Sequence, residues 1–111
     1  MPLKSYVLGS NGYIGRHLAR ELDRTGFENH NFDIHPEPLA GLKNYRAFDI
    51  TKREHYGELD PDVDFVFLFA GRTGTSASFT DYEGFIDANE IGPLHALEWM
   101  RETGCRARLV F

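Results

Sequence analysis

The sequence is poor in cysteine and lysine, and both scarcities exclude classes of function. Its single cysteine, Cys105, cannot form an internal disulfide, and no Cys or His pair has the spacing of zinc ligands. The only lysines are Lys4, Lys43 and Lys52, and the Gly-x-x-x-x-Gly-Lys-Ser/Thr pattern of a P-loop is absent. We therefore expect no disulfide framework, no metal site and no hydrolysis of ATP or GTP.

Clustered basic residues and long apolar runs are also missing. The net charge is -5 and the pI is about 5.4, with Lys and Arg scattered along the chain, so nucleic acid is not an expected partner. No apolar run approaches the roughly 20 residues that cross a bilayer. Residues 1–9 lead into a strand-like segment without the apolar core of a signal peptide. These features predict a cytoplasmic protein without a membrane partner.

What is present is an alternation of strand-like and helix-like segments, in a chain long enough for one domain, residues 1–111. Short β-favouring runs predict strands at 5–8, 29–34, 45–48, 64–69 and 108–111, and helical spacing predicts helices at 14–25, 51–59 and 81–103. The alternation predicts an α/β fold of the Rossmann type, a doubly wound parallel sheet with strand order 3-2-1-4-5, truncated after strand five. The unfinished sheet edge would expose apolar surface and so favour a homo-oligomer.

Three of these elements carry more specific signals. Thr51 followed by Glu54 is typical of a capping box that opens the second helix. The nearly continuous apolar run at 64–69 predicts a strand covered on both faces. In the long helix, Pro93 predicts a kink. The apolar face expected for this helix consists of Phe85, Ile86, Ile91, Leu94, Leu97 and Met100.

The segment between the first strand and the first helix carries three glycines at a spacing of three. Gly9 allows a sharp turn off the strand, Gly12 lets a pyrophosphate approach the main chain, and Gly15 lets the helix pack closely on the sheet. Phosphates would then contact free N–H groups at the positive end of the helix. A purely structural glycine turn is the alternative. The candidate cofactor contacts in this segment are Gly9, Asn11, Gly12, Tyr13, Ile14 and Gly15.

Asp33 lies at the tip of the second predicted strand, 18 residues after Gly15. A carboxylate there can accept hydrogen bonds from both ribose hydroxyls of the adenosine half of a dinucleotide, and it would repel a 2'-phosphate. This favours NAD over NADP, although the nearby Arg16 or His35 could accommodate NADP. The alternative is that Asp33 caps the loop before Pro36.

Together with Asp33, the glycine turn, the segment Phe48-Asp49-Ile50-Thr51 and the helix that contains Asn89 carry a family resemblance. The chain resembles the extended short-chain dehydrogenase/reductase family of NAD-dependent epimerases and dehydratases along its whole length. The resemblance implies that Asp49 and Ile50 hold the adenine.

Two further segments match the family incompletely. The segment Phe67-Leu68-Phe69-Ala70-Gly71 is similar to the His-x-Ala-Ala that the family usually has there, but the histidine is missing. Its candidate cofactor contacts are Phe69, Ala70 and Gly71. Asn89 opens a stretch similar to Asn-x-x-Gly-Thr, with Pro93 in place of the threonine. The resemblance implies that these segments also contact the cofactor, and that four residues of the following loop lie near the nicotinamide ribose and the substrate: Arg72, Thr73, Thr75 and Ser76.

The resemblance also implies the reaction of a longer parent enzyme, namely hydride transfer on a nucleotide sugar or related substrate. In the family a Ser/Thr and a Tyr-x-x-x-Lys pair carry this chemistry. None of the five tyrosines is followed by lysine four positions on, so we assign no catalytic residue. A non-catalytic NAD-binding regulatory or redox-sensing module is the alternative. A flavodoxin-like domain ranks last, because glycines and not acidic residues follow the first strand.

Overall fold

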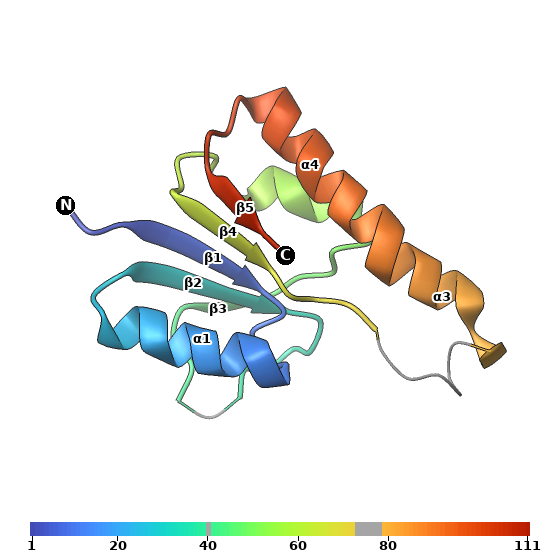
Figure 1. The fold of residues 1–111 in the computed structure, drawn as a ribbon, viewed down its shortest axis with the longest axis horizontal. Coiled ribbons are helices and arrows are strands. Elements are labelled where there is room, and N and C mark those ends of the chain that lie inside the picture. The colour runs from blue at the N-terminus through green and yellow to red at the C-terminus, as the bar shows by residue number, and fades with distance from the viewer. Residues whose placement is uncertain (40, 73–78) are drawn as a thin grey trace.

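A single five-stranded parallel sheet organises the protein, of which the computed structural model describes residues 1–39, 41–72 and 79–111. The strand order is β3-β2-β1-β4-β5, and every neighbouring pair is parallel (Figure 1). The predicted fold class and strand order are therefore confirmed, and each strand lies within two residues of its predicted bounds. The strands are β1 (Lys4–Leu8), β2 (Glu28–Asp33), β3 (Tyr45–Ala47), β4 (Phe65–Leu68) and β5 (Arg108–Val110).

Helices cover the two faces of the sheet unequally. Helix α1 (Tyr13–Arg24) contacts β1 and β2, where it buries Ala19 and Leu22. The 3-10 helix η1 (Arg53–Glu58) and helix α4 (Gly92–Thr103) cover the opposite face. In Figure 1, α1 lies beside β2, and α4 lies beside η1. The main hydrophobic core is on the α4 side and consists of Tyr6, Leu8, Phe32, Phe48, Ile50, Tyr56, Leu59, Val63, Val66, Leu68, Ala96 and Trp99.

Strand β4 departs from its prediction. Val66 and Leu68 are buried, but Phe65 and Phe67 are only half-buried and stack on each other, with ring centroids 5.8 Å apart. The expectation of a strand covered on both faces is wrong, because α1 packs on β1 and β2 and covers less of the face that β4 contributes. An apolar run of strand length therefore does not by itself prove burial on both sides.

The long helix contains a change of winding. It comprises α3 (Tyr82–Ile86), the π-helical turn η2 (Asp87–Ile91) and α4, whose first turn contains Pro93. Pro93 has no N–H that could donate a hydrogen bond to the carbonyl of Asn89. The wider π turn directly before Pro93 accommodates this missing hydrogen bond. In Figure 1, α3 and α4 run on in nearly the same direction, so the predicted kink is wrong and a π turn stands in its place.

The apolar face predicted for this helix is largely wrong. Ile86, Ile91, Leu94 and Leu97 are 37–58% exposed. The buried positions are instead Ala88, Gly92, Ala96 and Trp99. Small residues allow a close approach: a β-carbon on Gly92 would lie 2.7 Å from Cδ1 of Ile50. The buried face therefore consists of three small residues and Trp99, and a count of large apolar residues overlooks the small ones.

The predicted capping box at Thr51 is also wrong. The hydroxyl of Thr51 donates to Asp49 Oδ1 at 2.7 Å, and its N–H donates to the same oxygen at 2.9 Å. Lys52 precedes the helix without a side-chain cap. Thr51 completes a local turn with Asp49 instead, because that carboxylate lies within reach of both of its donors.

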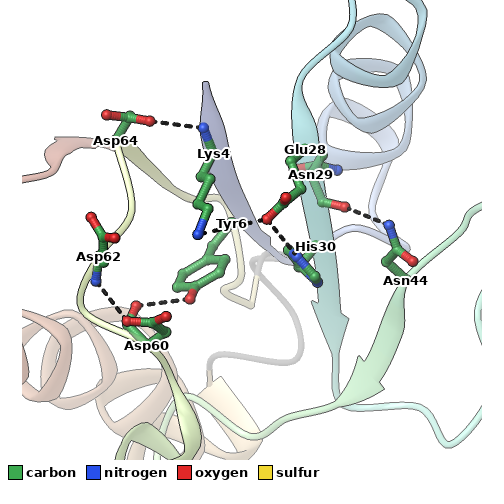
Figure 2. A network of polar contacts seen from close by, with 9 residues as sticks. All are labelled: Lys4, Tyr6, Glu28, Asn29, His30, Asn44, Asp60, Asp62 and Asp64. Atoms are coloured by element: carbon green, nitrogen blue, oxygen red, sulfur yellow. Dashed lines mark hydrogen bonds and ion pairs between the residues drawn. The ribbon is translucent and has the colours of Figure 1, made fainter. Parts of the chain in front are cut away.

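Polar contacts join the amino ends of the strands. The main-chain N–H of Lys4 donates to Asp64 Oδ2 at 2.8 Å, and the hydroxyl of Tyr6 donates to the Asp60 carbonyl at 2.8 Å (Figure 2). Burial, reinforced by the charge of Asp60, raises the pKa of Tyr6, so this hydroxyl keeps its proton. The loop before β4 is thus attached to β1 at this end of the sheet, and the glycine turn lies at the other end.

Candidate functional site

A cavity of about 480 Å³ lies beyond the carboxyl ends of β1, β2 and β4. This is where an open parallel sheet places ligands, and the volume falls within the roughly 300–1,000 Å³ of small-molecule sites. Segments more than 60 residues apart in the sequence meet there. The predicted site residues that line it are Gly9, Asn11, Gly12, Asp33, Asp49, Ile50, Phe69, Ala70, Gly71 and Arg72.

Two glycines of the turn are required by close packing. Gly9 has φ +105°, and a β-carbon there would lie 2.5 Å from the main-chain nitrogen of Ala70. A β-carbon on Gly15 would lie 2.0 Å from the carbonyl oxygen of Gly9. These distances leave no room for a methyl group, so Gly9 and Gly15 bring β1, α1 and the end of β4 together.

Gly12 differs from the other two glycines. It lines the cavity, and a β-carbon there would meet only the carbonyl oxygen of Gly9, at 3.3 Å. The packing of the described residues therefore constrains this glycine much less than it constrains Gly9 and Gly15. An exposed stretch of main chain at the cavity wall is what a bulky anionic group needs in order to approach.

The first turn of α1 offers main-chain donors next to Gly12. The first bond of the helix runs from the N–H of Arg16 to the carbonyl of Gly12 at 3.0 Å, so the N–H groups of Tyr13, Ile14 and Gly15 precede the helical ladder. No acidic residue lies in this turn, and no side chain caps it. The helix end is thus a positive, donor-rich position suited to phosphate.

Tyr13 and Ile14 can contribute only their main chain at this position. Their side chains are 71% and 65% exposed, and neither they nor Gly15 line the cavity. The ring of Tyr13 instead contacts His17 and the guanidinium of Arg16, which lies 5.2 Å from its centroid.

Asp33 holds the glycine turn and also faces the cavity. Its Oδ2 accepts the N–H of Asn11 at 2.8 Å, and its Oδ1 accepts the N–H of Ile34 at 2.7 Å. A carboxylate oxygen can accept more than one hydrogen bond, so both oxygens retain acceptor capacity. The local capping role and the cavity-lining role therefore coexist in one side chain.

Asp49 is oriented by three contacts. Besides the two bonds from Thr51, its own N–H donates to His55 Nδ1 at 3.0 Å. These contacts leave its Oδ2 unused. The neighbouring Ile50 lines the cavity, and the buried hydroxyl of Tyr56 donates to its carbonyl at 3.0 Å. Burial raises the pKa of Tyr56 above its usual range, so this bond persists at alkaline pH.

Asn89 supports the site from behind and does not line the cavity. Its Oδ1 accepts the N–H of Arg72 at 2.7 Å, and its Nδ2 donates to the carbonyl of the same residue at 2.8 Å. The Arg72 guanidinium lies over the ring of Phe85 at 4.7 Å and bonds to Asp81 at 2.6 Å. That hydrogen bond holds the pKa of Asp81 below its usual range. Of the loop residues named from the sequence, Thr73, Thr75 and Ser76 lie outside the described residues.

Sequence reasoning missed a wall of the cavity that the long helix provides. Gly84, Asp87 and Ala88 line the cavity, together with Ile34 and Thr51. A signal was available in the sequence, because small residues recur every four positions along one helical face. These residues are Gly84, Ala88, Gly92 and Ala96.

Neither a metal site nor a membrane span is seen in the described part of the chain. Over residues 1–39, 41–72 and 79–111, no three His, Cys, Asp or Glu side chains are grouped to hold a metal ion. Within the same ranges no helix combines the length and apolar character needed to cross a bilayer.

Known proteins share both the sequence pattern and the fold. Residues 5–111 match the family described as NAD dependent epimerase/dehydratase. A UDP-glucose 4-epimerase of Streptococcus mutans is 31% identical over 90% of this chain, and protein CapI of Staphylococcus aureus is 25% identical over 89%. A crystal structure of a UDP-galactose 4-epimerase superposes with a TM-score of 0.77 at 25% identity, over 94% of this chain. The chain spans about a third of the length of these proteins, namely 32%, 34% and 36%.

Proposed function

Since the chain belongs to the NAD dependent epimerase/dehydratase family, we propose that its cavity binds NAD and that it forms the cofactor-binding part of an enzyme acting on a nucleotide sugar. The observation that carries the proposal is the bare main chain at Gly12, which stands next to three N–H groups that precede the helical ladder. An anionic diphosphate fits this arrangement because it needs close approach, hydrogen-bond donors and positive potential at one place.

The remaining cavity residues suit the other parts of the cofactor. Asp33 has spare acceptor capacity for the ribose hydroxyls, and its charge disfavours a 2'-phosphate, so NAD is preferred over NADP. Asp49 and Ile50 offer a carboxylate oxygen and an apolar surface on which an adenine can be held. The end of β4, at Phe69, Ala70 and Gly71, lines the part of the cavity next to the glycine turn.

The substrate and the reaction belong to the proposal as well. The relatives include a UDP-glucose 4-epimerase, and a UDP-galactose 4-epimerase shares the fold, so a nucleotide sugar is the favoured substrate class. When bound, NAD would accept a hydride from the substrate. The residues of this chain would bind and orient the cofactor. No Tyr-x-x-x-Lys pair is present in the sequence, so we assign the cofactor-binding role and no catalytic residue. A cytoplasmic location and self-association remain predictions.

Calorimetric titration with NAD, NADP and ATP tests the proposal. We expect NAD to bind, NADP to bind more weakly, and Gly12→Val to abolish NAD binding while the circular dichroism spectrum is retained. Gly57→Val is the matched control, because a β-carbon on Gly57 meets no atom within 4 Å and this residue does not line the cavity. A folded wild-type chain that binds only ATP, or none of the three nucleotides, would contradict the proposal.

A further inference from the structure

The side chain of Asn11 bonds to a segment that is distant in the sequence. Its Oδ1 accepts the N–H of Leu39 at 3.0 Å, and its Nδ2 donates to the carbonyl of Glu37 at 3.1 Å. A longer contact of 3.5 Å runs from the same Nδ2 to the hydroxyl of Tyr45. Both ends of the amide thus attach the glycine turn to the chain that follows β2.

Backbone conformation does not explain an asparagine at this position. Asparagine often occupies a turn because it tolerates a left-handed φ. Among the described residues, the non-glycine residue with a positive φ is Asn44, at 50°, so Asn11 has an ordinary φ. Its side-chain bonds are therefore the physical reason that accounts for the residue type.

The segment at 34–39 depends on a few anchors for its position. It has no helix or strand, and Pro36 and Pro38 lack the N–H groups that could otherwise hold it. Apart from Asn11, the hydroxyl of Tyr45 anchors it. Its single proton is shared between the carbonyl of His35 and, at 3.1 Å, that of Asp33, the residue before the segment. Burial, with a smaller effect from the charge of Asp33, raises the pKa of Tyr45, which keeps the hydroxyl protonated.

These anchors control part of the cavity wall. Ile34 and His35 line the cavity beside Asp33, and they belong to the segment that Asn11 and Tyr45 hold. A ribose 2'-substituent bound at Asp33 would face the same residues, since they directly follow it in the chain. A 2'-phosphate needs added room and a positive partner there, and the segment must move to provide either.

We propose that Asn11 is a positioning residue that ties the glycine turn to the segment 34–39, and that this tie sets the selectivity for NAD over NADP. The inference rests on the proposed function, because it concerns the same site. Release of the tie lets the segment withdraw and lets His35 approach a 2'-phosphate. Selectivity is then lost without any change to the carboxylate of Asp33.

The test compares the dissociation constants of NAD and NADP, measured by calorimetry, for the wild type and three variants. For Asn11→Ala we expect the ratio of the NADP constant to the NAD constant to fall about tenfold, since two anchoring hydrogen bonds are lost. For Tyr45→Phe we expect a fall of about threefold, because one weaker anchor is lost. Asn44→Gly is the control: it removes the bond from Asn44 Nδ2 to the Asn29 carbonyl, at 3.2 Å near the amino end of β2 (Figure 2), and glycine tolerates the φ of 50°. Its ratio should equal that of the wild type.

The outcomes separate this inference from the proposed function. If the wild type binds neither dinucleotide, the proposed function and this inference are both overturned. If the wild type prefers NAD and Asn11→Ala weakens NAD and NADP in parallel, the proposed function stands and the positioning role is overturned. Amide hydrogen exchange of the ligand-free protein adds a readout that needs no nucleotide. The Leu39 N–H should exchange faster in Asn11→Ala than in the wild type. An equal exchange rate would overturn the positioning role of Asn11.

Discussion

Alanine substitutions at Gly15 and Gly12 should separate packing from ligand access in the glycine turn. A β-carbon on Gly15 would lie 2.0 Å from the oxygen and 2.9 Å from the carbonyl carbon of Gly9, and 3.1 Å from the Cα of Ser10. All three are main-chain atoms, which cannot swing aside as a flexible side chain does. A β-carbon on Gly12 meets one atom, at 3.3 Å.

The geometry sets the expected loss of stability. In a helix, alanine is favoured over glycine by about 1 kcal/mol, whereas forcing a methyl group into a filled site costs about 1–3 kcal/mol or more. The 2.0 Å approach places Gly15→Ala at the upper end of that cost, so we expect a net loss of about 2 kcal/mol or more in the free energy of unfolding. Gly12 is the N-cap residue, where replacement by alanine costs about 1 kcal/mol or less.

Two assays distinguish the variants. Urea unfolding followed by the fluorescence of Trp99, with thermal unfolding by circular dichroism, measures stability. One kcal/mol corresponds to about 4–8 °C in Tm for a domain of this size, so Gly15→Ala should melt roughly 10 °C or more below the wild type. Gly12→Ala should melt within about 8 °C of the wild type, yet its NAD affinity should fall about tenfold or more, because the methyl group stands where the diphosphate approaches.

The reverse pattern would refute the reasoning. If Gly15→Ala is as stable as the wild type, then α1 does not approach the turn as closely as the structure shows. If Gly12→Ala keeps full affinity for NAD, the open main chain at this residue is not the phosphate site. If the two variants lose the same amount of stability and the same amount of NAD affinity, the two glycines share one role.

Three further predictions follow from individual contacts. Asp33→Asn should reduce the preference for NAD over NADP, because it removes the charge that repels a 2'-phosphate; nucleotide titration checks this, and an unchanged preference contradicts it. Tyr56→Phe should lower the free energy of unfolding by about 1–3 kcal/mol in urea, because the hydroxyl that bonds the carbonyls of Ile50 and Gly92 is buried. The hydrogen bond from Arg72 holds the pKa of Asp81 below its usual range. The cap that Asp81 provides to α3 is therefore present at neutral pH and is lost as the pH falls through that lowered pKa. Carbon-detected NMR titration should show this pKa rising in Arg72→Gln, and no rise would contradict the role of the guanidinium.

Much of the fold and part of the site could be predicted because their signals are local. A β-favouring run, a glycine turn and an amphipathic stretch in succession predict strand, turn and helix, and their repetition predicts the sheet order. The position of Asp33 at the tip of β2 follows from the same pattern, since it is the last residue before a segment with two prolines. Asp49 and Ile50 were identified by resemblance to the family, and the structure places them at the cavity.

Other features depended on which elements come close together. The long helix shows this best: its large apolar residues predicted one face, while the buried face is made of Ala88, Gly92, Ala96 and Trp99. The π turn before Pro93 also winds more widely than an α-helix, so the ideal period of 3.6 residues, from which the apolar face was predicted, does not hold through it.

The sequence by itself therefore determined the order of the elements, the parallel sheet and the position of the glycine turn, because these follow from the conformational preferences of neighbouring residues. Only the tertiary structure decided which distant groups meet. Asn11 bonds to Leu39, Asn89 holds Arg72, and the carbonyl of Gly9 excludes a side chain from Gly15. Such contacts depend on the distances between packed elements to within a few tenths of an ångström, and residue spacing along a chain does not encode those distances.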